Sequence, residues 1–208
     1  MVKLICSDCN GVLDHVNHDY SNTGYYNTKE SGFEIYKKIN KIIFESKYLN
    51  KSWMVNELSF EEVNLILSKK LNVEKEYLDK ILIQSVKEIN WNWELINLYQ
   101  KYRQQGIKVI ITTDNMDIFT KIAVPYNNFV KYFDKIFNSA DINLLKIEND
   151  YQFFNNISRE YGLNTYEILI IDDNKKTIEE TGKIGYKTYL YNSDTCKYFE
   201  DWFEKNRI

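Results

Sequence analysis

The sequence is poor in cysteine and has no long apolar run. Three cysteines in 208 residues is an odd, low number, which argues against a disulfide framework. No apolar run approaches the roughly 20 residues that a transmembrane helix needs. The opening MVKLIC turns polar at Ser7, earlier than the apolar stretch of a secretory signal peptide would allow. We therefore expect a cytoplasmic protein with no membrane partner.

Excess positive charge is also missing. The formal net charge is −3 and the pI is near 5.6, so there is no electrostatic case for binding nucleic acid. Hydrophobic residues make up 44% of the chain and charged residues 27%, which is a globular composition. A chain of this length is long enough for one sizeable core, or for one core that carries a smaller inserted domain.

Short, continuous apolar runs predict strands that are buried on both faces, as in a parallel sheet. These runs are Leu4–Cys6, Ile107–Thr112, Ile136–Phe137, Ile168–Ile171 and Thr188–Tyr191. Helical patterns alternate with them from about residue 91 onward, at Trp93–Gln105, Tyr151–Tyr161, Lys175–Thr181 and Tyr198–Lys205. This alternation predicts an α/β fold with a Rossmann-like, doubly wound parallel sheet.

Residues 15–89 contain no convincing strand. Helical patterns cover Phe33–Tyr48 and Tyr77–Val86, and Ser59 and Glu62 have the spacing of a capping box just before another apolar run. We therefore expect an all-helical domain at residues 15–89, inserted into a core made of residues 1–14 and 90–208.

Polar residues follow three of the predicted strands. The first strand runs into DCNG, the second into TTDN and the fourth into the doublet DD. In an open parallel sheet, ligands bind outside the carboxyl ends of the strands, where the strand order reverses. If the first strand lies between the second and the fourth, these residues meet in one crevice.

Four segments follow one another along the chain: DCNGVLD, VIITTDNMD, LLKIENDYQFF and ILIIDDNKKTIEETGKIGYKTYLY. In this order they resemble the motifs of the haloacid dehalogenase (HAD) superfamily with a helical, C1-type cap inserted after the first motif, and the resemblance covers almost the whole chain. It implies a hydrolase, most often a phosphatase that uses Mg²⁺ and acts on a small phosphorylated metabolite. Both a monomer and a homodimer remain open.

The resemblance also assigns roles to individual residues. Asp8 stands in the position of the nucleophile, whose carboxylate attacks phosphorus and holds the phosphoryl group as an acyl phosphate. Thr113 supplies a hydroxyl group for the phosphoryl oxygens; Thr112 is the alternative, but the spacing from Gly106 fits the family better for Thr113. Lys146 stands where the family has a lysine that links the phosphate and the nucleophile, although Ile147 follows it where proline is common.

A metal site follows from the same resemblance, because a carboxylate that attacks a phosphate dianion needs a neutralising cation. The implied Mg²⁺ ligands are Asp8, the backbone carbonyl of Asn10, and the pair Asp172 and Asp173, all of them hard oxygen donors. The residues assigned to substrate binding are Gly11, Asp114 and Asn115, with Gly11 also allowing the tight turn of the loop.

Asn10 departs from the family pattern, which usually has a second aspartate there to protonate the leaving group and later to deprotonate water. An amide does not exchange a proton at useful pH, and general acid–base catalysis contributes about 10²- to 10⁴-fold. Three explanations remain open: a slow or specialised enzyme, a protein that binds phospho-ligands without turnover, or an engineered substitution. Because Asn-Gly sequences are prone to deamidation, an aspartate could also form there. A metal-independent haloacid dehalogenase is the alternative enzyme, but the Asp172–Asp173 pair speaks against it.

The cysteines, histidines and tryptophans of the chain are also candidates for a function, but simpler structural roles account for them. Cys6 and Cys9 have C-x-x-C spacing but no second pair and no suitably spaced histidine, so we expect neither zinc nor redox chemistry. His15 and His18 flank the entry to the helical insertion, where they could bind a metal or face substrate, but are more simply solvated. We expect Trp53, Trp91 and Trp93 to pack in the core or between cap and core. Residues 20–27 could line a substrate entrance.

Overall fold

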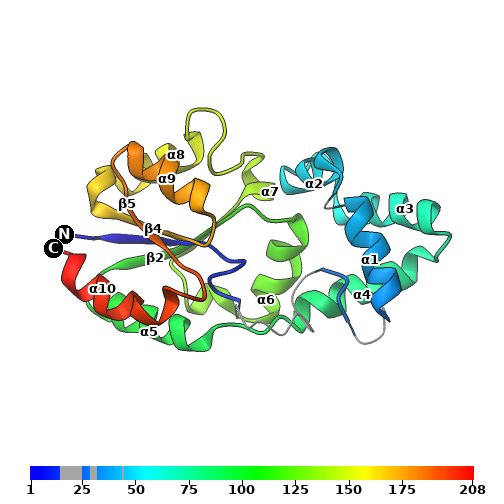
Figure 1. Cartoon of the computed structure of the whole chain (residues 1–208), viewed down its shortest axis with the longest axis horizontal. Helices are drawn as coiled ribbons and strands as arrows, with labels where there is room; N and C mark the ends of the chain where they lie inside the picture. Colours follow the sequence, from blue (N-terminus) through cyan, green and yellow to red (C-terminus); the bar gives the residue numbers. More distant parts are fainter. Residues whose placement is uncertain (15–24, 29–31, 44) are drawn as a thin grey trace.

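A parallel sheet lies at one end of the molecule and four helices lie at the other (Figure 1). The computed structural model describes residues 1–14, 25–28, 32–43 and 45–208. The five strands run in the order β3-β2-β1-β4-β5, and each pairs in parallel with its neighbours. They are β1 (Leu4–Ser7), β2 (Lys108–Thr113), β3 (Lys135–Asn138), β4 (Ile168–Asp172) and β5 (Lys187–Leu190).

The central strand β1 lies between β2 and β4, which is the arrangement that brings the polar ends of these strands together. Ser7, its last residue, pairs with Ile111 of β2 and with Ile171 of β4. The backbone N–H of Asp8 continues the ladder by donating to the Ile171 carbonyl at 2.8 Å. The chain runs outward from β1 through β2 to β3 and then returns to β4 on the other side, so the strand order reverses beside β1.

Helices cover both faces of the sheet (Figure 1). Helices α8 (Gln152–Tyr161) and α9 (Lys175–Lys183) lie on one face, and α5 (Trp93–Gln104) and α10 (Phe199–Asn206) lie on the other. Side chains of β1 alternate between two apolar clusters: Leu4 and Cys6 pack with α8, whereas Ile5 packs with α5 and α10. This two-sided burial explains why the strands read as continuous apolar runs.

Shorter elements complete the core. They are the π-helical turn η1 (Phe119–Ala123), α6 (Val124–Tyr126), η2 (Phe129–Lys131), α7 (Ser139–Ile142), η3 (Thr165–Glu167) and η4 (Cys196–Tyr198). None of the helices within the described residues has the length and apolarity that a membrane span requires.

The helices beyond the sheet are α1 (Gly32–Ile43), α2 (Lys47–Met54), α3 (Phe60–Leu71) and α4 (Lys75–Lys87). The predicted capping box is present at the start of α3, where Ser59 and Glu62 each accept the other's backbone N–H. The chain leaves the core at Asp14, which forms an antiparallel bridge with Trp91 on the return path. Because exit and return lie side by side, we propose that residues 15–89 form a separate helical domain. Its first boundary falls outside the described residues.

Two expectations about this region were wrong. The pattern over residues 33–48 is not one helix: α1 ends at Ile43, and α2 begins at Lys47 after Ser46, whose hydroxyl accepts the Leu49 N–H as an N-cap. Trp53 and Trp91 are buried as predicted, but Trp93 is 40% exposed, because α5 turns Leu95 and Ile96 inward instead. His15, His18 and residues 20–24 lie outside the described residues.

Candidate active site

Three carboxylates converge where β1 and β4 end. Asp8 directly follows β1, Asp172 is the last residue of β4, and Asp173 comes next. One carboxylate oxygen from each of the three lies within 4.8 Å of the other two. Asp8 and Asp172 are buried, whereas Asp173 is exposed at the mouth of the cluster. Three oxygen donors at this separation are spaced for a hard divalent cation.

Lys146 places a positive charge inside this cluster. Its Nζ lies 3.1 Å from Asp8 Oδ1 and 2.7 Å from Asp172 Oδ2, and its side chain is only 5% exposed. The carboxylate of Asp114 accepts the backbone N–H of Lys146 at 2.9 Å, which fixes the loop that carries the lysine. Asp114 thus points toward the Lys146 loop, and its assignment to substrate binding stays a prediction.

The buried charges shift one another's protonation. Burial raises the pKa of Asp8 well above its usual range, and Asp172 and Asp173 add to the rise while Lys146 opposes it. Burial alone lowers the pKa of Lys146, but the carboxylates around it more than compensate and raise that pKa above the ordinary value. The lysine therefore stays charged, and the site holds more carboxylates than ammonium groups. A bound cation would balance that excess.

Thr113 ends β2, the strand that pairs with β1. The residue is 1% exposed, and its Oγ1 has no hydrogen-bond partner among the described residues. A buried hydroxyl group without a partner is costly, and most such groups in folded proteins are satisfied. A ligand with an acceptor oxygen would satisfy this one.

Gly11 lies against the Asp173 carboxylate. Its φ is +77°, and a Cβ at this position would fall 2.2 Å from Asp173 Oδ2. No other residue type offers both the left-handed backbone and the room. The glycine therefore allows the loop after β1 to approach the acidic pair.

We expect Gly11→Ala to weaken Mg²⁺ binding by about 10- to 100-fold, the range typical of disturbing groups around metal ligands, because the new methyl group displaces Asp173. The positive φ should also cost about 1–2 kcal/mol of stability. Gly106→Ala is the matched control: its φ is +88° and no heavy atom lies within 4 Å of the added Cβ. Calorimetric titration with Mg²⁺ and thermal unfolding separate the two effects. Equal Mg²⁺ affinity in both variants would contradict a role for Asp173 as ligand.

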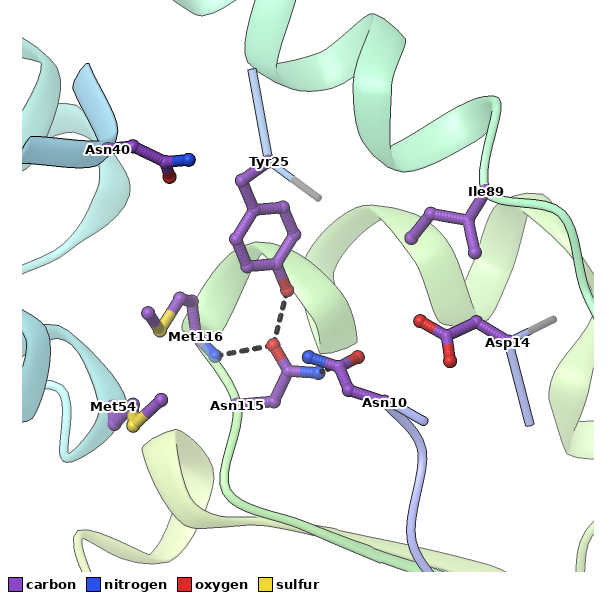
Figure 2. A pocket seen from close by; sticks show the side chains of 8 residues that line it. All are labelled: Asn10, Asp14, Tyr25, Asn40, Met54, Ile89, Asn115 and Met116. Carbon is purple, nitrogen blue, oxygen red and sulfur yellow. Dashed lines mark hydrogen bonds between the residues drawn. The ribbon is translucent and has the colours of Figure 1, made fainter. Parts of the chain in front are cut away.

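A cavity of about 240 Å³ opens between the core loops and the helical insertion. Figure 2 shows its lining: Asn10, Asp14, Asn115 and Met116 from the core, and Tyr25, Asn40, Met54 and Ile89 from the insertion side. Sequence reasoning found Asn10 and Asn115 and included Tyr25 in the suspected entrance segment. It did not single out Asp14, although a second acid soon after Asp8 was a signal, or Asn40.

Asn115 connects the two sides of the cavity (Figure 2). Its Oδ1 accepts the Tyr25 hydroxyl group and, at 2.8 Å, the backbone N–H of Met116. Because that N–H is an obligatory donor, the amide orientation is settled, and Nδ2 is left to donate to Asn10 Oδ1 at 3.4 Å. The side chain of Asn10 is therefore held at the cavity wall by Asn115.

The two cysteines of the C-x-x-C pair lie within and just after β1, and the backbone N–H of Cys9 donates to Asp8 Oδ1. Cys6 and Cys9 are buried and free, and burial raises the pKa of both thiols, which suits inert core cysteines.

No family model matches the sequence, and no curated protein sequence matches it. Solved structures do match. A predicted HAD-like family hydrolase from Porphyromonas gingivalis superposes with a TM-score of 0.71 over 98% of both chains at 18% identity. A HAD family enzyme from Bacteroides thetaiotaomicron, crystallised with magnesium and inorganic phosphate, gives 0.68 over 91% of this chain and 93% of that one at 19% identity. The L-2-haloacid dehalogenase from Xanthobacter autotrophicus gives 0.63 over 90% and 76% at 15% identity.

Sequence identities this low support a shared fold, but they do not identify the reaction. The three similar structures agree in covering the sheet and the helical insertion together, since each aligns with at least 90% of this chain. The chain therefore shares its fold with these solved structures.

Proposed function

We propose that the chain is a Mg²⁺-dependent phosphatase that acts on a small phosphorylated metabolite through an aspartyl-phosphate at Asp8. The observation that carries this proposal is the cluster of Asp8, Asp172 and Asp173, in which the buried Asp8 and Asp172 both contact the Lys146 ammonium group. The Bacteroides enzyme of the same fold was crystallised with magnesium and phosphate, which adds support.

The donor set fits Mg²⁺. Asp8, Asp172, Asp173 and the backbone carbonyl of Asn10 would hold the ion, and all four offer hard oxygen atoms. When bound, Mg²⁺ would neutralise the substrate phosphate and lower its repulsion from the carboxylates. A dehalogenase that works without metal has no use for an acidic cluster beside its nucleophile, so the cluster favours phosphoryl transfer.

Each side chain then has a role in the transfer. Asp8 would form the bond to phosphorus, with Lys146 holding that carboxylate in place by its 3.1 Å contact. The unpartnered Thr113 hydroxyl group would donate to a phosphoryl oxygen. The cavity beside Asn10 and Asn115 would take the organic part of the substrate. Asn10 itself cannot transfer a proton, so turnover of poor leaving groups needs another acid.

We expect the protein to hydrolyse p-nitrophenyl phosphate with Mg²⁺ and to lose about 10²- to 10³-fold of that rate after chelation with EDTA, since a catalytic metal supplies several kcal/mol of charge stabilisation. Phosphate release is the measurement, and restoring Mg²⁺ should restore the rate. Chloride release from 2-chloropropionate in EDTA would favour the dehalogenase instead. Mg²⁺ binding without any turnover would favour a phospho-ligand-binding protein, the function to which Asn10 points.

A further inference from the structure

The cavity next to Asn10 contains a carboxyl group that the proposed mechanism has not used. Among the described residues that line it, Asp14 is the acidic one, and Figure 2 shows its side chain directed into the cavity on the side of Asn10. Asn10 and Asp14 therefore face the same volume. The proposed function places the organic part of the substrate in this cavity, so Asp14 would lie beside it.

The loop after β1 holds the Asp14 carboxylate in place. The backbone N–H of Gly11 donates to Asp14 Oδ1 at 2.5 Å, and the Cys9 carbonyl accepts the N–H groups of Val12, Leu13 and Asp14. Gly11 is also the residue that packs against Asp173. One glycine therefore links the Asp14 carboxylate to the acidic cluster, while Asp14 itself lies four positions beyond Asn10.

The surroundings of Asp14 suit proton transfer near neutral pH. Burial, the largest cause, raises its pKa to about 6, and the Asp173 carboxylate adds to the rise. Among the residues that the structure describes, Cys9 and Tyr25 also interact with it. Burial raises both of their pKa values well above the usual range, so they stay neutral. A carboxyl group with a pKa near the working pH can both give and take a proton.

We propose that Asp14 is the general acid and base of the reaction, in the role that Asn10 cannot perform. This inference rests on the proposed phosphatase function. As Asp8 forms its bond to phosphorus and the bond from phosphorus to the leaving oxygen breaks, the Asp14 carboxyl group gives its proton to that oxygen. The resulting carboxylate then takes a proton from water, whose oxygen bonds to phosphorus as the bond to Asp8 breaks. Inorganic phosphate leaves, and both aspartates return to their starting forms.

The test compares Asp14→Asn with the unmodified protein on two substrates of similar shape, p-nitrophenyl phosphate and phenyl phosphate, of which phenyl phosphate has the poorer leaving group. We expect kcat/KM to fall by about 10²- to 10⁴-fold for phenyl phosphate and by about tenfold or less for p-nitrophenyl phosphate. Because the acid must be protonated, kcat/KM of the unmodified protein should fall above pH of about 6. The pH profile of Asp14→Asn should not show this fall in kcat/KM.

Two further variants sharpen the test. Asp141→Asn removes another carboxyl group whose pKa burial raises but which does not line the cavity, and it should leave both rates unchanged. Asn10→Asp should restore phenyl phosphate hydrolysis when combined with Asp14→Asn, yet raise the rate of the unmodified protein by less than about tenfold.

Three results would overturn the role of Asp14 while leaving the phosphatase proposal intact. The first is an equal loss of kcat/KM on the two substrates in Asp14→Asn, with an unchanged pH profile. The second is a double variant in which Asn10→Asp does not restore phenyl phosphate hydrolysis. The third is a gain of about a hundredfold in rate from Asn10→Asp alone, because such a gain means that the unmodified protein had no proton transfer. Absence of phosphatase activity toward both substrates, with Mg²⁺ present, would overturn both proposals together.

Discussion

Asp8→Asn abolishes phosphate release from p-nitrophenyl phosphate, with an expected loss in kcat on the order of 10⁶-fold, as when a covalent nucleophile is removed from other enzymes. An amide nitrogen or oxygen is too weak a nucleophile to form the bond to phosphorus. The replacement has nearly the same shape and can still accept the Cys9 N–H that now binds Asp8 Oδ1 at 2.8 Å. The loss is therefore chemical and not structural.

Stability measurements separate the two causes. Lys146 keeps its 2.7 Å contact with Asp172 in the Asp8→Asn variant, so the thermal unfolding temperature should stay close to that of the unmodified protein. Intact-mass analysis after rapid acid quenching should find a phosphoryl group on the unmodified chain and none on the variant. A variant that keeps about 1% or more of the original kcat would contradict the assignment of Asp8 as nucleophile.

Lys146→Met should lower the free energy of unfolding by about 3–5 kcal/mol, because it leaves the buried carboxylates of Asp8 and Asp172 without their counter-charge. Methionine keeps most of the apolar stem and removes the ammonium group. Chemical denaturation at pH 7 is the measurement. Lys135→Met is the matched control: Lys135 pairs with Glu160 at 2.7 Å, but both side chains are 45% exposed, so its loss should stay within about 1 kcal/mol.

The loss of stability in Lys146→Met depends on pH through the pKa of Asp8. Burial already raises it above 3.8 in the folded protein, and loss of the lysine raises it further. The folded variant then binds more protons than the unfolded chain, so its stability increases as pH falls through the raised pKa toward 3.8. The deficit relative to the unmodified protein should therefore shrink in mild acid, and Mg²⁺ should reduce it at neutral pH. A deficit no larger than that of Lys135→Met would contradict the paired arrangement.

The main elements of the fold follow from local sequence patterns. Continuous apolar runs such as Ile168–Ile171 predict strands that are buried on both faces. The strand β4 contains this run and extends it by one residue. Ser59 and Glu62 marked the start of α3 because a capping box is a local interaction. The pattern over residues 33–48 misled because amphipathic periodicity runs across α1 and α2 alike, and Ser46 breaks the helix through one hydrogen bond.

The candidate site could be predicted from the acidic residues at the ends of the strands. Asp8, Asp172 and Asp173 lie at the ends of two buried strands that neighbour each other, so the topology of a parallel sheet brings them together. Their roles as nucleophile and metal ligands remain predictions, which the variants above test. Asp114 and Asn115 follow the same strand end, yet one turns to the Lys146 backbone and the other to Tyr25, a difference that no strand pattern contains.

Local patterns were enough to predict the sheet, its buried strands and the acidic residues at their ends, because these depend on apolar runs and on a parallel topology. The cavity that Asp14 shares with Asn10, and the place of Lys146 between two carboxylates, could be seen only in three dimensions. Both facts depend on how loops from distant parts of the chain pack against each other. Such contacts are set by shape and burial in three dimensions, and they leave no periodic trace along the chain.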